Sequence, residues 1–321
     1  MIRLPSILPQ VDFAVLLRDA RTRFLQPALA NAIRSIDIRT VDSELAALVP
    51  AAALTGISAR GLRGDLLFAT PCVIRADPRL VAYYRLALGI SQKTFYGAGA
   101  GAGSFKMAEQ HGRLSASAEK SLDGLCGTLV ASAVTLLASM RSGDEARSTL
   151  HDLSLLTLGA QFRGGRNNKL GEAGASQVFA LLRDIVSGTI IKIGDRSIEI
   201  RNAAKRKVVI EFAAAPDIVI RAEMKPGQFR QVIAIEIKAG TDFSNIHNRL
   251  GEAEKSHQKA RAADIQECWT VINVRLKDAD AKKASPSTNR FYQLAKLELR
   301  KGAGYEDFRD RVISLTGIKA K

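Results

Sequence analysis

The chain has 321 residues, 46% of them hydrophobic, and its 47 Lys and Arg against 32 Asp and Glu give a net charge of +15. Such a high apolar content excludes a chain that is disordered throughout, because burial of these side chains can offset the entropy lost on folding. The positive charge is spread along the chain, which indicates an anionic partner such as a polyphosphate. Three widely spaced cysteines without a C-x-x-C pair exclude a disulfide framework and the usual zinc spacings.

Helical patterns dominate the first 160 residues. Apolar residues recur at helical spacing over Val11–Ile36, and a second helix is predicted over Pro78–Gly89. A third, alanine-rich helix is predicted over Ser115–Met140. Between the last two lies Gly97–Gly103, an alternation of glycine and alanine that we interpret as a flexible loop and not as a dinucleotide-binding turn.

The pattern contains no clear secretion or membrane signal. The N-terminal stretch MIRLPSILPQVDF has a short apolar run broken by two prolines, which is not typical of a signal peptide. The most apolar stretch, Leu125–Met140, is too short for a bilayer and includes four Ser and Thr residues, so we interpret it as a buried helix. We therefore expect a cytoplasmic protein with no membrane partner.

From about residue 161 the pattern becomes that of an α/β module. Arg163–Gly174 is polar and rich in glycine, which predicts a connector, and a helix follows over Ala173–Val186. Thr189–Ile200 predicts a hairpin that turns at Gly194-Asp195. The later predicted elements are strands in 207–212, 217–224, 231–240 and 268–276, and helices in 245–263, 287–300 and 305–315. We predict two domains, a mainly helical region over 1–160 and an α/β core over 161–321.

The clearest chemical signal lies in two of these strands. Pro216-Asp217 begins one strand, and Glu236 and Lys238 interrupt the apolar run of the next. A carboxylate flanked by two isoleucines is costly to bury unless a cation or a metal ion compensates its charge. Residues two apart in a strand face the same way, so Asp217, Glu236 and Lys238 share one face if the two strands are neighbours.

This constellation predicts phosphodiester hydrolysis. Two converging carboxylates raise each other's pKa unless a divalent cation binds between them, and oxygen ligands favour Mg²⁺. We therefore expect Asp217, Glu236 and Lys238 to be catalytic, with the two carboxylates as metal ligands and the lysine orienting water or neutralising phosphate charge. The alternative is a surface hairpin with polar edges, which the apolar run over 232–238 disfavours.

The P-D and E-x-K residues resemble the motif of the PD-(D/E)xK nuclease superfamily, which includes most type II restriction endonucleases. Three further segments resemble restriction enzymes, namely Ala82–Gly97, Gly171–Ile185 and Gly240–Ala262. The chain is most similar to the XcyI family of restriction endonucleases, over nearly its whole length. This resemblance implies a mostly helical N-terminal region followed by a restriction-endonuclease-like core, in which helices flank a central mixed β-sheet.

The same resemblance implies a type II site-specific deoxyribonuclease that hydrolyses double-stranded DNA with Mg²⁺ and leaves 5′-phosphates. It implies the recognition sequence C-C-C-G-G-G, cut after the first C. It also implies that Asp217, Glu236 and the carbonyl of Ile237 bind the metal and that Lys238 is the catalytic lysine.

Two other acids are candidates for the same site. Some members of the superfamily add a glutamate from the first core helix, and Glu172 is the candidate here. An acid at a helix N-terminus is also favoured by the helix dipole alone, so Glu172 needs no catalytic role. Glu211 lies at the end of a predicted strand, and the sequence leaves its direction open.

The helix after the motif offers contacts to DNA. The candidate residues, which recur at spacings of three and four, are Asn245, Asn248, Arg249, Lys255 and Lys259. Asn and Arg can pair with base edges, whereas Lys suits phosphates. The alternative is a solvated amphipathic helix with internal pairs such as Glu252–Lys255.

Symmetric cutting of a palindrome needs two active sites related by a two-fold axis, so we expect a homodimer. The helical first region would then serve dimerisation, DNA clamping or both. A cognate DNA methyltransferase is expected as a genetic rather than a physical partner.

The sequence leaves two other functions open. A DNA repair or junction-resolving nuclease with the same core would cut according to DNA structure. A non-enzymatic nucleic-acid-binding protein with structural acids would bind without metal and tolerate Lys238→Ala.

Overall fold

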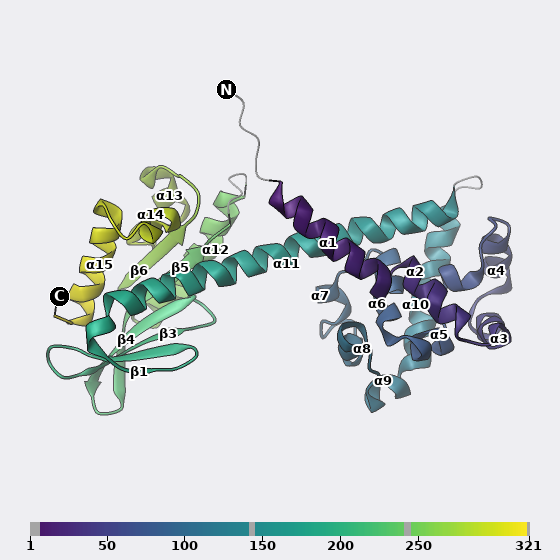
Figure 1. The fold of residues 1–321 in the computed structure, drawn as a ribbon, viewed down its shortest axis with the longest axis horizontal. Helices are drawn as coiled ribbons and strands as arrows, with labels where there is room; N and C mark the ends of the chain where they lie inside the picture. The colour runs from purple at the N-terminus through teal and green to yellow at the C-terminus, as the bar shows by residue number, and fades with distance from the viewer. Residues whose placement is uncertain (1–6, 141–144, 241–244, 320–321) are drawn as a thin grey trace, which may run out of the picture. The chain divides into compact units, whose positions relative to one another are not determined.

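The structure is a computed structural model that describes residues 7–140, 145–240 and 245–319. The chain divides into two compact units, Met1–Gly165 and Arg166–Lys321, which have separate hydrophobic cores. Figure 1 shows that helices make up the first unit and that the second combines a sheet with helices. The fold class predicted from the sequence is therefore confirmed.

The first unit consists of helices packed around one large core, with a smaller buried cluster that includes Ala20 and Leu25. Long amphipathic segments such as α3 bury one apolar stripe, which includes Val41 and Leu45. The helices are α1 (Leu8–Arg23), α2 (Gln26–Arg34), α3 (Ile38–Leu48), α4 (Ala51–Ser58), α5 (Pro71–Ala76), α6 (Val81–Ala87), α7 (Gln92–Phe95), α8 (Lys106–His111), α9 (Ala116–Lys120) and α10 (Leu122–Ser139). Short 3-10 helices lie at η1 (Gly64–Leu66), η2 (Pro78–Leu80) and η3 (Gly103–Phe105).

The helix α10 is long and apolar enough to cross a membrane by length and composition. Its buried face, which includes Cys126, Leu129 and Ala133, belongs to the core of the first unit. On its exposed face, the hydroxyl groups of Thr128 and Ser132 donate hydrogen bonds to carbonyls four residues earlier in the helix. The predicted helix is therefore confirmed, but only one of its faces is buried in the core.

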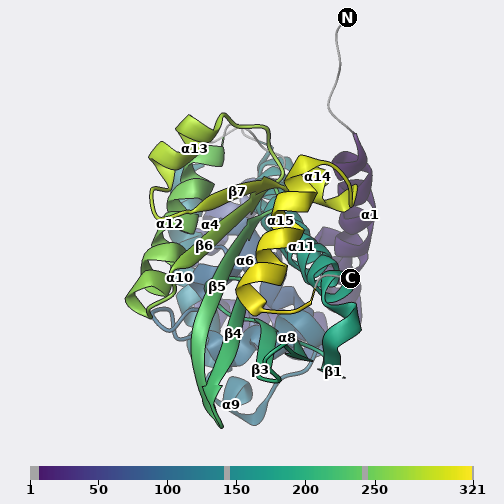
Figure 2. The same ribbon diagram turned by 90° about the vertical axis from the view of Figure 1, so that its left-hand side faces the viewer.

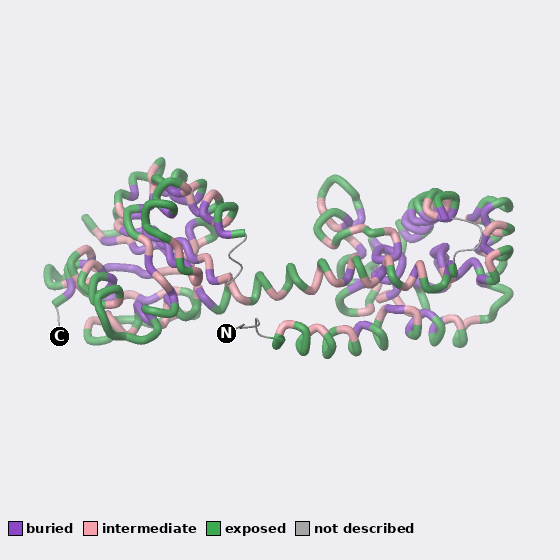
Figure 3. Tube along the Cα trace, turned by 90° about the horizontal axis from the view of Figure 1, so that it is seen from above, coloured by how far each residue is buried: buried purple, intermediate pink, exposed green. Residues whose placement is uncertain are grey.

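The glycine-rich segment Arg163–Gly174, which the sequence predicted to be a connector, contains the boundary between the two units but is helical. It lies inside α11 (Ala146–Ile185), and much of it is exposed, as Figure 3 shows. Each glycine in a helix costs about 1 kcal/mol relative to alanine. That cost is offset at both ends of α11, because Leu150 packs in the first core and Leu182 packs in the second.

The second unit contains, within the described residues, a seven-stranded mixed sheet in the order β1 to β7. Strands β1 to β5 pair antiparallel, and β5–β6 and β6–β7 pair parallel. The strands are β1 (Ile190–Ile193), β2 (Ser197–Arg201), β3 (Lys207–Phe212), β4 (Ile218–Lys225), β5 (Gln228–Lys238), β6 (Glu267–Ile272) and β7 (Arg290–Gln293). The predicted hairpin is confirmed as β1–β2.

Helices cover both faces of the sheet around β5 and β6 (Figure 2). The C-terminal part of α11 and α15 (Ala303–Thr316) pack on the isoleucine-rich face, whereas α12 (Ile246–Ala262) packs on the other. The remaining helices are η4 (Ser187–Thr189), α13 (Asp278–Ala284) and α14 (Leu294–Glu298). Because Gly174 has no side chain, α11 comes close to β5: a Cβ there would lie 2.3 Å from that of Ala239.

The sequence-based prediction fails in part near the C-terminus. The predicted helix over 287–300 is β7 followed by α14, and α13 was not predicted. Strand β7 is only four residues long, and its pairing with β6 is a long-range contact that no local pattern reveals. Its Tyr292 is buried against Trp269 and Phe308, which helps to hold the strand in the sheet.

Candidate active site

The antiparallel pairing of β4 and β5 brings the predicted carboxylates together. Ile218, the first residue of β4, lies opposite Ile235. Continuing this register by one pair places Asp217 opposite Glu236, and opposed residues of an antiparallel pair point to the same face. Strand β5 lies between β4 and β6, so the apolar run around Glu236 is a central strand, as the sequence predicted.

Glu236 is held from two sides. Its side chain is only 9% exposed, and Oε1 lies 2.9 Å from Nζ of Lys238. The hydroxyl group of Ser256, on α12, donates a 2.7 Å hydrogen bond to Oε2. Both carboxylate oxygens therefore have a partner, which is what a buried carboxylate requires.

Asp217 lies half-buried beside this pair. Its Oδ2 accepts a 2.7 Å hydrogen bond from the N–H of Ile237. Burial, together with the negative charge of Glu236, raises the pKa of Asp217 to about 6, although the Ile237 N–H and Lys238 act in the opposite direction. The two carboxylates thus repel each other, and a cation between them would relieve that repulsion.

Lys238 stays charged at neutral pH. Burial opposes its charge, but Glu236 and Glu252 outweigh burial and raise its pKa above the ordinary value. Oε2 of Glu252, on α12, lies 3.3 Å from the lysine Nζ. Lys238 can therefore donate hydrogen bonds and positive charge, but it cannot serve as a base.

The oxygen-rich donor set fits a hard divalent cation such as Mg²⁺. Asp217 and Glu236 supply carboxylates, and the N–H and C=O of one residue in an antiparallel strand face the same neighbour. Because the Ile237 N–H faces Asp217, its carbonyl faces the same side. Within the described residues, no three side chains of His, Cys, Asp or Glu gather to hold a metal ion, so this site offers two carboxylates only.

The other two candidate acids do not join Asp217 and Glu236 as a third carboxylate. Glu172 is exposed on α11. Glu211, on β3, forms an ion pair with Arg221 in which the guanidinium Nε lies 3.0 Å from Oε1. Glu211 therefore already has a cationic partner.

Two residues of α12 contact the constellation although the sequence did not predict these contacts, namely Ser256 and Glu252. The signal was present, because both lie on the helix that directly follows β5 and covers that face of the sheet. His257, the residue after Ser256, is fully buried, and its Nε2 forms a 2.8 Å hydrogen bond with the hydroxyl group of Thr270. Burial lowers the pKa of His257 to about 4. His257 is therefore a neutral core residue.

The five predicted DNA-contacting residues lie at or near the start of α12 and along its length. Asn245, Asn248, Lys255 and Lys259 are exposed, which agrees with the predicted stripe. Arg249 is half-buried, and its guanidinium fills the space where a side chain at Gly240 would lie. In the alternative interpretation, Glu252 pairs with Lys255. In the structure, Glu252 instead contacts Lys238.

The chain is similar to known restriction enzymes over nearly its whole length. Residues 15–319 match the pattern of the XcyI restriction endonuclease family. The type II restriction enzyme XcyI of Xanthomonas campestris pv. cyanopsidis is 49% identical over 315 residues, covering 97% of this chain and 95% of that protein. The type II restriction enzyme Cfr9I of Citrobacter freundii is 48% identical over 319 residues, covering 98% and 97%. The chain belongs to the XcyI restriction endonuclease family.

Proposed function

We propose that the chain is a Mg²⁺-dependent type II restriction endonuclease that cuts double-stranded DNA at C-C-C-G-G-G and leaves 5′-phosphates. The observation that carries this proposal is the convergence of Asp217, Glu236 and Lys238 at one end of the central strand, in a chain of a restriction endonuclease family. The recognition sequence rests on the family resemblance. The two similar enzymes and the net charge of +15 support DNA as the substrate.

In this proposal, Asp217, Glu236 and the carbonyl of Ile237 hold Mg²⁺. When bound, the ion would polarise a phosphoryl oxygen and lower the pKa of a water molecule. The N–H of Ile237 fixes one oxygen of Asp217, and Ser256 fixes one oxygen of Glu236. The chain thereby holds both carboxylates in place before a substrate arrives.

Lys238 has a separate part in the proposed reaction. Its raised pKa keeps the ammonium group charged, so it would orient the attacking water by hydrogen bonding and neutralise charge that develops on the phosphate. Glu252 holds the same ammonium from the helix side and is 67% exposed. Because Lys238 is already protonated, it would not accept the proton that leaves the water.

The DNA would lie along α12. Its exposed residues Asn245 and Asn248 suit base edges, and Lys255 and Lys259 suit phosphates. We further propose a cytoplasmic homodimer, with the helical region over 1–160 serving dimerisation or DNA clamping, and a cognate methyltransferase as its genetic partner. Two-fold symmetry would match a palindromic site.

The proposed function is tested by digesting a plasmid of known sequence with the purified protein and Mg²⁺. We expect discrete fragments whose ends all lie within C-C-C-G-G-G and carry 5′-phosphates. Discrete ends at another sequence would support the restriction activity but overturn the proposed recognition sequence. Cuts that follow branches or junctions regardless of sequence would instead identify a repair or junction-resolving nuclease.

Ser256→Ala is expected to weaken the site without removing a proposed ligand. The variant leaves Oε2 of Glu236 without its buried donor, and loss of such a supporting hydrogen bond typically costs about 10- to 100-fold in metal affinity or activity. The Mg²⁺ concentration that gives half-maximal cleavage should rise accordingly. Ser256→Thr retains the hydroxyl group and should restore it. An unchanged Mg²⁺ requirement in Ser256→Ala would show that this bond is structural only.

A further inference from the structure

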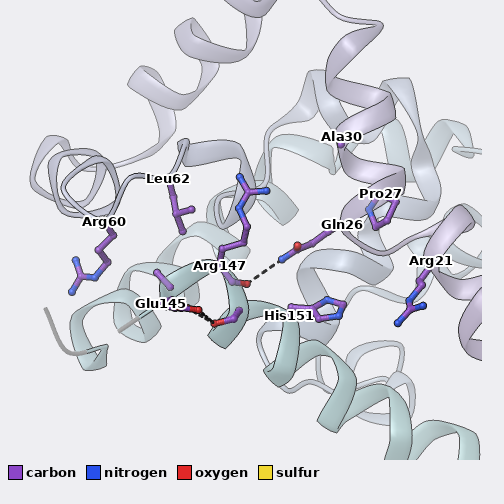
Figure 4. A pocket seen from close by; sticks show the side chains of 11 residues that line it. Arg21, Gln26, Pro27, Ala30, Arg60, Leu62, Glu145, Arg147 and His151 are labelled. Atoms are coloured by element: carbon purple, nitrogen blue, oxygen red, sulfur yellow. Dashed lines mark hydrogen bonds between the residues drawn. The ribbon is translucent and has the colours of Figure 1, made fainter. Parts of the chain in front are cut away.

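The first unit contains a basic pocket that the proposed active site does not use. Its volume is about 810 Å³, and α1, α2, the segment after α4 and the start of α11 line it (Figure 4). The basic residues are Arg21, Arg60, Arg147 and His151. Among the described lining residues, Glu145 is the one acid, and it accepts a hydrogen bond from Ser148.

Several donors in this pocket have no protein acceptor. The side chains of Arg21 and Arg147 are exposed and form neither a hydrogen bond nor an ion pair with any residue the structure describes. Nδ1 of His151 is also unpaired within the described part of the chain, but it is buried away from the open pocket. Because the guanidinium groups of Arg21 and Arg147 are unpaired and Glu145 is the one acid among the described lining residues, the pocket suits an anion with several oxygens.

Arg60 has a different position. Its Nη1 and Nη2 donate to the carbonyls of Gly56 and Met140 at 2.7 and 2.8 Å. In Figure 4 it lies at the far end of the pocket from Arg21 and His151. Arg60 therefore supplies positive charge from a fixed position, whereas Arg21 and Arg147 keep their guanidinium donors for a ligand.

The backbone adds to this preference. The first turn of α11 lines the pocket, and the first N–H groups of a helix have no acceptor within the helix. The helix dipole also favours negative charge at this end. Backbone and side chains thus point to the same class of ligand, a phosphate group.

We propose that this pocket binds phosphate groups through Arg21 and Arg147. A guanidinium group pairs with two phosphate oxygens at once, which distinguishes this chemistry from general attraction to a basic surface. The phosphates can come from the DNA backbone, a source that rests on the proposed function, or from a free polyphosphate compound.

The test compares a double variant, Arg21→Gln with Arg147→Gln, with a matched control, Arg18→Gln with Arg34→Gln. The control removes two exposed arginines from α1 and α2 outside the pocket. Binding of a DNA duplex is measured in EDTA over a range of salt concentrations. If backbone phosphates bind in the pocket, the slope of log affinity against log salt becomes shallower by about 1 for each pocket arginine, and the control changes it less.

A second arm titrates each protein with inorganic pyrophosphate by calorimetry. Loss of pyrophosphate binding in the pocket variant, with an unchanged salt slope for DNA, would support the phosphate site and assign it to a free compound. Pocket variants that match the control in both arms would overturn the site. If the wild-type protein neither binds nor cuts DNA, the proposed function fails, and the pyrophosphate arm still tests the pocket.

Discussion

Lys238→Ala is expected to slow DNA cleavage by about 100- to 1000-fold at saturating Mg²⁺, the usual cost of removing a group that stabilises charge in a transition state. Its ammonium group lies 2.9 Å from Glu236 and stays charged at neutral pH. Affinity for the DNA site should stay close to that of the wild type, because the proposed DNA-contacting residues lie on α12. Single-turnover cleavage and duplex binding measure the two effects separately.

Lys225→Ala is the matched control, since Lys225 is exposed at the opposite end of β4 from Asp217. It should cleave at nearly the wild-type rate. Thermal unfolding of both variants shows whether loss of Lys238 harms the fold by leaving Glu236 without its cation. A folded Lys238→Ala variant that cuts as fast as the control would remove this lysine from the mechanism.

Glu109→Gln is expected to destabilise the first unit by about 3–5 kcal/mol, the usual cost of breaking a buried ion pair. Arg85 has no exposed surface, and its Nε and Nη2 donate to the two oxygens of Glu109 at 3.0 and 2.8 Å. Gln92 and Tyr96 donate to the same carboxylate. The variant would leave the charge of Arg85 buried without a counterion, and thermal or denaturant unfolding at neutral pH measures the loss.

The same carboxylate predicts a dependence of stability on pH. Burial opposes ionisation of Glu109, but its bonds to Arg85 outweigh burial and hold its pKa below the ordinary value of glutamate. Its contribution is therefore complete above the ordinary glutamate pKa and is lost as the pH falls through the lower, folded-state value. Acid should accordingly destabilise the wild type more than Glu109→Gln.

An exposed ion pair provides the comparison. Arg75 and Glu119 are 2.6 Å apart, but their side chains are 47% and 45% exposed, so Glu119→Gln should cost less than about 1 kcal/mol. Equal losses in the two glutamate variants would contradict the importance assigned to burial of the Arg85 pair.

The sequence predicted the strands that carry Asp217, Glu236 and Lys238 well because their signal is local. Isoleucine and valine runs mark β3 to β6, and the period of two in a strand places Glu236 and Lys238 on one face. Asp217 joins that face only if the two strands are neighbours, and the β4–β5 register confirms that they are.

Other features depend on contacts between distant segments, and local patterns did not reveal them. The glycines of Arg163–Gly174 favour a loop locally, yet packing at both ends makes this stretch part of α11. Ser256 and Glu252 look like ordinary polar residues of an amphipathic helix until α12 is placed on β5. The predicted loop at Gly97–Gly103, in contrast, lies between α7 and η3 outside any helix or strand for most of its length.

Plasmid digestion shows whether Asp217 and Glu236 hold a divalent cation for phosphodiester hydrolysis. Wild-type protein and Asp217→Asn are compared with Mg²⁺ and with EDTA, and the fragments are mapped. The proposal predicts site-specific fragments from the wild type with Mg²⁺ only, and intact plasmid from Asp217→Asn at the same Mg²⁺ concentration. Equal cleavage in EDTA, or by a folded Asp217→Asn variant, would contradict it.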